Sequence, residues 1–204
     1  TRNTRIPYND RFFDDYSPLV AYYAGLLQAD GSIKLTKSNT YQLHLGLAYK
    51  DRDLVLSFCR DMEIPEDRVK DQDFLHNGNL CKRTYIRITG DKLQEQLAQY
   101  GIFPNKTYNY YQPYFPEHLF PYFFKGMVDG DGCVSLKKNY CRIEVVGNAD
   151  MLKWAYDMIK KSNYQGKLLY YIKKTGVHNY RLGSLVVSGQ QNVVDFADWM
   201  HYKE

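Results

Sequence analysis

Two acid-terminated apolar stretches constrain this chain more than any other feature of its sequence. The first, YYAGLLQADGSI, covers residues 22–33, and the second, YFFKGMVDGDGCV, covers residues 122–134. Each has the pattern of a short apolar helix that ends on an acid followed by glycine, Asp30-Gly31 and Asp131-Gly132. A carboxylate at the negative C-terminal end of a helix is destabilising by about 0.3–1 kcal/mol. Because the same local rule is broken twice, 101 residues apart, we expect a functional reason.

The segments that follow the two acids repeat in the same order. Alternating apolar and polar residues predict paired strands, and apolar residues at helical spacing predict a helix after each pair. Two further strands and a closing helix follow, the helix opening after Thr89-Gly90 or Ser188-Gly189. The sequence therefore predicts a mixed α/β fold of two αββαββα repeats with antiparallel sheets. The predicted strands are 32–37, 41–49, 68–75, 82–88, 133–138, 141–147, 167–174 and 180–188, and the predicted middle helices are 51–62 and 149–160.

The repeat divides the chain into four parts. Residues 1–16 form an N-terminal extension, 17–103 the first repeat, 104–116 a connector and 117–204 the second repeat. Four of the seven prolines lie in 101–121 among many aromatic residues, which predicts a connector that packs along the body. The extension carries three arginines, and its sequence is compatible both with an arm that contacts phosphates and with a frayed end.

Local signals set the start, the end and the packing face of the first apolar helix. Ser17 is a predicted N-cap, Pro18 suits the first helical position, and Gly31 predicts a left-handed turn at the C-terminus. Glycine inside a helix costs about 1 kcal/mol relative to alanine, so small residues one turn apart indicate close approach of two helix backbones. The small residues on the predicted contact faces are Gly25 and Ala29 in the first helix and Gly126 and Gly130 in the second.

If these faces pack together, Asp30 and Asp131 meet across a local two-fold axis. Two carboxylates at two negative helix ends repel each other unless a cation lies between them. Hard oxygen ligands with open coordination positions are typical of Mg²⁺ sites that also bind substrate phosphates. The alternative is that Asp-Gly only makes a turn into a strand, which explains one occurrence more readily than two matched ones.

Composition and residue spacing argue against several classes of protein. Apolar and charged contents of 44% and 25% are those of an ordinary globular protein, and the net charge of +4 is too small to name a partner. No apolar run approaches the roughly 20 residues that cross a bilayer, so we expect an intracellular protein with no membrane partner. Four cysteines without a C-x-x-C pair predict reduced thiols, and five histidines without ligand spacing argue against a histidine-metal nuclease.

A nine-residue motif underlies both apolar helices. YAGLLQADG (residues 23–31) and FKGMVDGDG (residues 124–132) each match it over all nine positions. On these residues and their spacing, the chain resembles the LAGLIDADG homing endonucleases that carry two motifs in one chain, and the resemblance covers nearly the whole sequence from about Ser17. It implies a saddle-shaped monomer that needs no protein partner. Its motif helices would form the central interface, and its two four-stranded sheets would lie in the major groove of double-stranded DNA.

The resemblance also implies which residues carry the chemistry. Asp30 and Asp131 would be catalytic metal ligands in two overlapping sites, each cutting one DNA strand, with the backbone carbonyls of Ala29 and Gly130 as further ligands. Lys106 resembles the basic residue that accompanies the metal. The expected cofactor is Mg²⁺, with Ca²⁺ supporting binding without cleavage.

The two halves differ at two places, one within the motif and one after the second strand. Tyr49-Lys50 occupies the polar and basic corner after the second strand, which makes Lys50 a further catalytic candidate, whereas the corresponding corner of the second half is Gly147-Asn148. At the sixth motif position Gln28 replaces the usual acid, while Asp129 keeps it. These departures predict two sites of unequal efficiency.

Polar side chains at the outward positions of the predicted strands are candidates for reading DNA. Arginine and lysine pair with guanine edges in the major groove, and glutamine and asparagine pair with adenine. Taken singly, each such residue is also compatible with an ordinary solvated strand position. The candidates are Lys34, Gln42, His44, Arg83, Tyr85 and Arg87 in the first half and Lys137, Arg142, Tyr171, Lys173, His178 and Arg181 in the second.

The main functional hypothesis is therefore a sequence-specific, Mg²⁺-dependent endonuclease that hydrolyses phosphodiester bonds in double-stranded DNA. The alternative hypothesis places a binding protein on the same fold, either an RNA maturase that assists intron splicing or a DNA-binding regulator without cleavage. Retention of both acids argues against lost catalysis but is compatible with a maturase. A scaffold or inhibitor has only the repeat in its favour.

Overall fold

The computed structural model describes residues 5–137, 140–173 and 181–202, and it contains the two repeats that the sequence predicts. Each repeat runs helix, strand, strand, helix, strand, strand, helix. The first repeat comprises α1 (Pro18–Asp30), β1 (Gly31–Leu35), β2 (Tyr41–Ala48), α2 (Arg52–Asp61), β3 (Lys70–His76), β4 (Asn79–Gly90) and α3 (Leu93–Ala98). The second comprises α4 (Phe120–Asp131), β5 (Gly132–Lys137), β6 (Tyr140–Asn148), α5 (Ala149–Lys161), β7 (Leu168–Lys173), β8 (Leu182–Ser188) and α6 (Gln190–Trp199).

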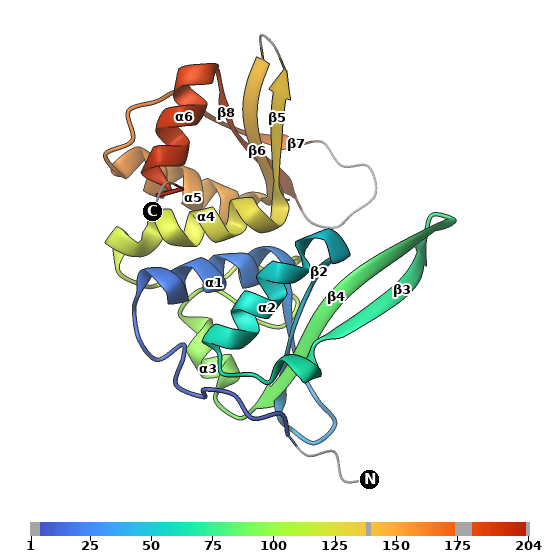
Figure 1. The fold of residues 1–204 in the computed structure, drawn as a ribbon. Coiled ribbons are helices and arrows are strands. Elements are labelled where there is room, and N and C mark those ends of the chain that lie inside the picture. Colours follow the sequence, from blue (N-terminus) through green and yellow to red (C-terminus); the bar gives the residue numbers. More distant parts are fainter. Residues whose placement is uncertain (1–4, 138–139, 174–180, 203–204) are drawn as a thin grey trace.

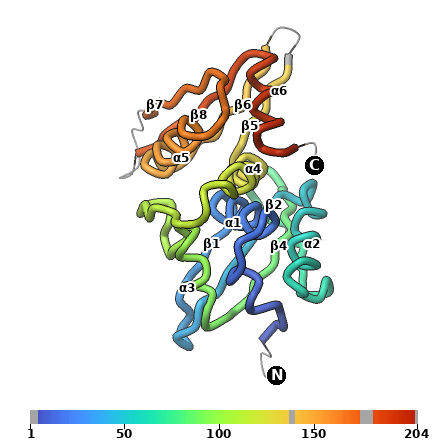
Figure 2. The backbone as a smooth tube through the Cα atoms, turned by 90° about the vertical axis from the view of Figure 1, so that its left-hand side faces the viewer, coloured from blue at the N-terminus to red at the C-terminus, as the bar shows by residue number. Residues whose placement is uncertain are grey.

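Each repeat forms one four-stranded antiparallel sheet, with strand orders β1-β2-β4-β3 and β5-β6-β8-β7. The two sheets extend to opposite sides of the central pair α1 and α4, and α2, α3, α5 and α6 cover one face of them (Figure 1). The view turned by 90° shows the same division into two halves about the central helices (Figure 2). None of the helices in the described part of the chain covers the other face of either sheet. Among the described helices, none is both long and apolar enough to cross a membrane.

The centre of the molecule is the contact between α1 and α4. A Cβ placed on Gly25 would lie 1.8 Å from the Phe123 carbonyl oxygen, and one placed on Gly126 would lie 2.0 Å from the Tyr22 carbonyl oxygen. Both distances are far below van der Waals contact, so only glycine lets the backbones come this close. Around this contact the side chains of α1 and α4 are buried in a single apolar core that continues into both sheets.

The expected left-handed turn at the end of the first motif helix is wrong. Gly31 has φ −78° and ψ 157°, and Gly132 has φ −77° and ψ 141°, which are extended conformations. The reason is that each helix passes directly into a strand, so the chain has to straighten at this residue. Glycine is still needed there, because a Cβ on Gly31 would lie 2.5 Å from the Leu27 carbonyl oxygen.

Turn chemistry fixes two of the remaining boundaries. Asn77 and Gly78 have φ of 48° and 80°, the pattern of a type I′ turn, and they connect β3 to β4. The closing helix of the first half begins at Leu93 rather than directly after Thr89-Gly90, because β4 continues through Gly90. In the second half, α6 does begin directly after Gly189, which has φ 95°.

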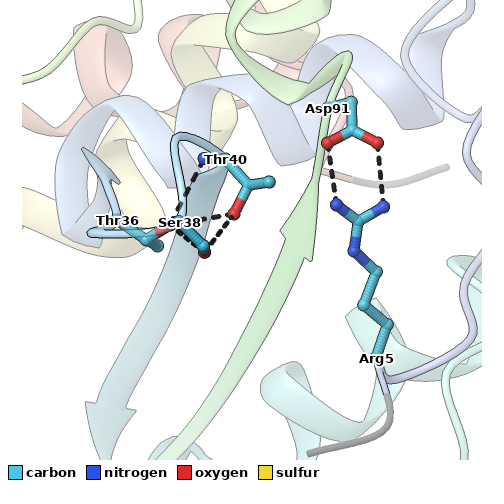
Figure 3. A network of polar contacts seen from close by, with 5 residues as sticks. All are labelled: Arg5, Thr36, Ser38, Thr40 and Asp91. Carbon is cyan, nitrogen blue, oxygen red and sulfur yellow. Dashed lines mark hydrogen bonds and ion pairs between the residues drawn. The ribbon is translucent and has the colours of Figure 1, made fainter.

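The described part of the N-terminal extension packs on the first repeat. Phe13 is buried, and the Arg5 guanidinium forms two hydrogen bonds with the Asp91 carboxylate, at 2.7 and 2.8 Å (Figure 3). Residues 5–16 are therefore neither a frayed end nor a free arm, and the first four residues lie outside the described part. The same figure shows the β1–β2 turn, in which the Thr36, Ser38 and Thr40 hydroxyls hydrogen-bond to one another.

The connector between the repeats packs along the body, as its aromatic content predicts. Phe115 contacts the rings of Tyr100, Phe123 and Trp154, so it bridges both repeats. The backbone amide of Tyr114 donates to the Gln99 carbonyl, which ties the connector to the end of α3. This arrangement also carries Lys106 to the ends of the motif helices.

Candidate active site

The packing of α1 on α4 brings the C-terminal ends of the two motif helices together. A Cβ on Gly130 would lie 2.4 Å from the Ala29 Cβ and 2.8 Å from a carboxylate oxygen of Asp30. The four small residues that the sequence places on the contact face, Gly25, Ala29, Gly126 and Gly130, therefore all lie between the two helices. Because Asp30 and Asp131 end these helices, their carboxylates face the same small region.

The protonation behaviour of the two acids reflects this crowding. Burial, then the Asp131 carboxylate, raises the pKa of Asp30 to about 6, while Lys106 opposes the shift. Burial also raises the pKa of Asp131, again opposed by Lys106, although the Asp131 side chain reaches solvent on one side. Two carboxylates that resist ionisation side by side are a site that favours a cation.

Lys106 lies at the junction of the helix ends. Its Nζ donates to the Gln28 carbonyl at 2.5 Å and to the Ala29 carbonyl at 3.2 Å. Burial lowers the pKa of Lys106 to about 8, and the charges of Asp131 and Asp30 oppose the shift. These two carbonyls belong to the last turn of α1, where a helix has no internal partners for them. Lys106 is thus held by the first motif while it faces both acids.

A third carboxylate near Asp30 was missed in the sequence. Asp51 is the last residue of a 3₁₀ turn (Tyr49–Asp51) before α2, and its charge contributes to the raised pKa of Asp30. It makes no side-chain cap for α2, although it occupies the N-cap position. Lys50 is exposed, and the Tyr49 ring lies under the Lys82 ammonium at 4.0 Å. The sequence did contain a signal for Asp51. An acid directly before a helix is a candidate N-cap, and if it makes no cap its carboxylate is free to contribute to a neighbouring site.

The sixth motif position differs between the halves in its partners as well as its identity. Asp129 accepts hydrogen bonds from the hydroxyls of Tyr22 on α1, at 2.9 Å, and of Tyr202. The Gln28 side-chain oxygen, by contrast, is buried without a hydrogen-bond partner. Asp129 therefore ties α4 to α1 and to the residues after α6.

The corner of the second half has a different construction. Asn148 caps α5 by accepting from the backbone amides of Asp150 and Met151, and its own amide donates to the Thr107 carbonyl at 3.3 Å. A cavity of about 80 Å³ opens here, lined by Gln28, Lys106, Asp131 and Asn148 among others. It is large enough to hold water beside the second acid.

The oxygen donors at the helix ends fit a divalent metal. Among the described residues, no group of three or more His, Cys, Asp and Glu side chains is arranged to hold a metal ion. Two crowded carboxylates with adjacent backbone carbonyls are nevertheless the hard, partial donor set that Mg²⁺ accepts, since it keeps several waters and takes few protein ligands. The Ala29 carbonyl, one of the expected ligands, accepts a hydrogen bond from Lys106.

The six DNA-reading candidates of the first half share one face of their sheet. The strand register pairs Lys34 with Gln42, His44 with Arg87, and positions Tyr85 and Arg83 next along β4 on that face. The Arg87 and Arg83 guanidiniums lie 4.7 and 5.6 Å from the centre of the Tyr85 ring, and His44 packs against the same ring. Within the described strands of this sheet, no Asp or Glu occupies this face.

The candidates of the second half are less uniform. Arg142, Tyr171 and Lys173 share the open face of their sheet and surround Glu144. Lys137 ends β5, paired with Tyr140. Arg181 lies outside the strands, and its guanidinium bonds to the Asp150 carboxylate of α5 at 2.6 Å, on the helix-covered side. His178 lies outside the described residues.

Known structures share this fold. No protein-family model matches the sequence, and neither does any curated protein. The homing endonuclease I-DmoI, solved in complex with DNA and Mn, aligns at 14% identity over 90% of this chain and 96% of its own, with a TM-score of 0.55. The homing endonuclease I-WcaI bound to its DNA recognition sequence aligns at 12% identity over 94% and 85%, with a TM-score of 0.58.

A protein of another kind has the same architecture. The N-terminal LAGLIDADG domain of DUF199/WhiA aligns at 13% identity over 97% of this chain and 91% of that domain, with a TM-score of 0.57. The chain therefore has the two-repeat LAGLIDADG fold, and the resemblance expected from the two motifs is confirmed at the level of the fold.

Proposed function

We propose that the chain is a site-specific endonuclease that cleaves double-stranded DNA with the help of a divalent metal, Mg²⁺ being the natural candidate. The observation that carries the proposal is the meeting of Asp30 and Asp131 at two helix C-termini that glycine packing brings together. Neither the helices nor the core gains from acids at that place. A bound cation would supply the positive charge that offsets the two acids, and the same cation would bind a DNA phosphate.

The residues around the acids have complementary roles. Asp30 and Asp131, with the carbonyls of Ala29 and Gly130, would hold the metal. When bound, it would lower the pKa of a water and polarise the scissile phosphate. Lys106 carries its proton at Nζ beside both acids, where it would stabilise the charge that develops on the phosphate. Asn148, at the cavity beside Asp131, would orient water for the second strand.

The open faces of the two sheets would bind the DNA. A sheet ribbon fits the major groove, and the guanidiniums of Arg83 and Arg87 have the fork geometry that pairs with guanine O6 and N7. The presence of DNA in the solved I-DmoI and I-WcaI complexes supports this partner for the present chain. We propose that it acts as a monomer, because both acids and both sheets come from one chain.

One observation favours a second candidate, a binding protein that does not cleave. The Lys106 ammonium hydrogen-bonds to the carbonyls of Gln28 and Ala29, so a lysine already supplies positive charge at the end of the first motif helix. A regulator of DNA, or a maturase that binds intron RNA, would use the same fold with the lysine in place of a metal.

The deciding experiment is incubation of the chain with a randomised duplex library, first with Mg²⁺ and then with Ca²⁺, followed by sequencing of the ends and of the retained duplexes. The proposal expects discrete cuts at one long site with Mg²⁺ and uncut, site-selective complexes with Ca²⁺. Asp30→Asn should abolish double-strand cutting and leave binding intact. Asp129→Asn, whose amide oxygen can still accept from Tyr22, is the matched control and should still cut. Site-selective binding without cutting under either ion would favour the second candidate.

A further inference from the structure

The two sheets differ in charge at one equivalent position. In the first repeat β1 and β2 pair Gly31 with Leu45, and in the second repeat β5 and β6 pair Gly132 with Val145. This register makes His44 and Glu144, one residue earlier in each second strand, equivalent positions. Both lie on the open face of a central strand, one in each half.

Glu144 is the centre of a closed set of contacts. Its carboxylate accepts from Arg142 at 2.8 Å, Lys173 at 3.1 Å, the Ser184 hydroxyl at 2.5 Å and the Tyr171 hydroxyl at 3.2 Å. These groups come from three neighbouring strands, β6, β7 and β8. The Ser184 hydrogen bond, followed by Lys173 and Arg142, holds the pKa of Glu144 below its usual range, so it stays ionised at neutral pH.

The same contacts hold Arg142 from several sides. Its guanidinium also donates to the Tyr140 hydroxyl at 3.2 Å and to the Tyr171 hydroxyl at 3.3 Å. A cation held in this way has lost much of its freedom before any ligand arrives, and a lysine or arginine beside a carboxylate gains less from a phosphate than a free one does. Two of the basic residues of this face therefore share one carboxylate, which offsets one of their two positive charges.

The equivalent region of the first sheet is arranged in the opposite way. His44 is partly buried, and burial, then Arg87, Arg83 and Lys34, lowers its pKa to about 4, so it is neutral at pH 7. The Arg83 and Arg87 guanidiniums lie over the Tyr85 ring, and Arg83 also donates to the neutral Gln72 side chain, so neither of these contacts is with an acid. Their charge remains available to a polyanion.

We propose that Glu144 is a positioning and specificity-determining residue for the second half of the DNA interface. It fixes Arg142 and Lys173 in place for contact with base edges and offsets one of their two positive charges. The second sheet then contributes mainly discrimination, and the first sheet contributes the larger share of the electrostatic affinity. This inference rests on the proposed function. Its physical basis is that phosphate contacts give affinity without sequence information, whereas a fixed guanidinium discriminates between bases.

Direct reading of a base by Glu144 is the competing interpretation. A carboxylate can accept from the cytosine amino group. Four donors already share the two oxygens of Glu144, so this role would require one of them to be displaced. The experiment separates the two.

The test measures binding in Ca²⁺ to the duplex recovered from the library and to a scrambled duplex of equal length, over a series of KCl concentrations. Each phosphate contact contributes about 0.9 to the slope of log affinity against log salt. Glu144→Gln should steepen the slope for the scrambled duplex by about 1, tighten binding to it by about 3- to 10-fold at about 0.1 M salt, and reduce the preference for the selected site. Ser184→Ala removes a neutral donor to the same carboxylate and should leave the slope unchanged.

A second pair of variants tests the inference if Glu144→Gln does not fold. Lys173→Met and Arg87→Met each delete one cation from an open face. Arg87→Met should flatten the slope by about 1, and Lys173→Met should flatten it by less, because Lys173 is ion-paired with Glu144 in the unmodified chain.

Several outcomes would overturn the inference. Equal slope changes for Lys173→Met and Arg87→Met would do so, as would an unchanged slope and preference in folded Glu144→Gln. Loss of a cytosine preference at one position with an unchanged slope would make Glu144 a base reader instead. If the unmodified chain selects no duplex at all, the proposed function fails, and that result is distinct from any of these.

Discussion

The two halves of the molecule are alike where helices touch and unlike where the sheets face outward. At the helix contact, a Cβ placed on Gly25 or on Gly126 would come almost equally close to a carbonyl oxygen of the facing helix, that of Phe123 or that of Tyr22. On the open faces, the equivalent positions hold different side chains. The first sheet has a neutral histidine among cations, and the second has an ionised glutamate that is ion-paired with two cations of its own sheet. Close backbone packing admits only glycine at these positions, so both copies have it. A surface that meets an asymmetric ligand has no such constraint, and there the copies differ.

The largest expected effect tests the symmetric part of this comparison. Gly25→Ala and Gly126→Ala should each destabilise the fold by about 3 kcal/mol or more, since the new Cβ would collide with backbone atoms that cannot move independently. The two losses should be similar. Urea denaturation followed by circular dichroism measures them.

Gly147→Ala is the matched control for the glycine variants. The nearest atom to a Cβ at that position, outside its chain neighbours, lies 4.0 Å away, so alanine fits without strain. A clear difference between the Gly25 and Gly126 variants, or a cost as large at Gly147, would show that the helix contact is not the symmetric centre of the molecule.

The helix contact and its acids are also the part that local sequence predicts best. Cap, proline, small-residue spacing and terminal acid all lie within one short segment, Ser17 to Gly31, and the second copy repeats most of them. Once two such helix faces are predicted, each is the obvious packing partner of the other. The left-handed turn at Gly31 was wrong because the strand that follows, rather than the helix, decides the backbone conformation there.

The rest of the site depends on register, which the sequence does not show. A single 3₁₀ turn decides that Asp51, rather than its neighbours, lies near Asp30. The role of Glu144 depends on pairing across three strands. Arg181 is directed away from the open face because its position has the opposite parity to Leu182 and Ser184, which lie on the same face as Glu144. Each of these is set by contacts between segments far apart in sequence.

The second prediction concerns the lysine that only the first motif holds. Lys106→Met should reduce cleavage by about 100-fold, the usual cost of removing one donor that stabilises a developing charge. Because its contacts are with carbonyls of α1 alone, we expect the two strands to be affected unequally and nicked duplex to accumulate. Gel analysis of both strands over time gives the two rates. Lys161→Met, at the end of α5 on the helix-covered side, should cut at the normal rate. Equal slowing of both strands would contradict the assignment of Lys106 to one half.

A reciprocal exchange sharpens the comparison of the sheets. His44→Glu places the acid of the second sheet among Arg87, Arg83 and Lys34 of the first. Binding to a scrambled duplex should weaken by about 10-fold, and its salt slope should flatten by about 1, because the added carboxylate offsets one of those positive charges. His44→Gln keeps the position neutral and is the control. If His44→Glu and His44→Gln have the same slope, the first sheet does not supply the electrostatic affinity that we assign to it.

The smallest expected effect is a difference between Asp30 and Asp131 in how much each carboxylate destabilises the folded protein. Without metal, the folded pKa of Asp30 is about 6, above the ordinary value of 3.8, so the folded state binds more protons than the unfolded state between these pH values. Stability therefore falls as pH rises from about 4 to 6, and the full cost is present above pH 6. Removing the charge should remove the cost.

Asp30→Asn in EDTA at pH 7.5 should accordingly raise stability by about 1–2 kcal/mol after allowance for solvent screening, which is a few degrees in Tm for a chain of this size. The gain should shrink as pH falls and vanish below about pH 3, where Asp30 is protonated in both states. Asp131→Asn should gain less, because Asp51 acts on Asp30 but is not among the charges that shift Asp131. Mg²⁺ should stabilise the unmodified chain more than either variant. A gain of the same size at pH 4 and pH 7.5 would mean that Asn stabilises by packing, and the charge conflict at the helix ends would then be too weak to require a metal.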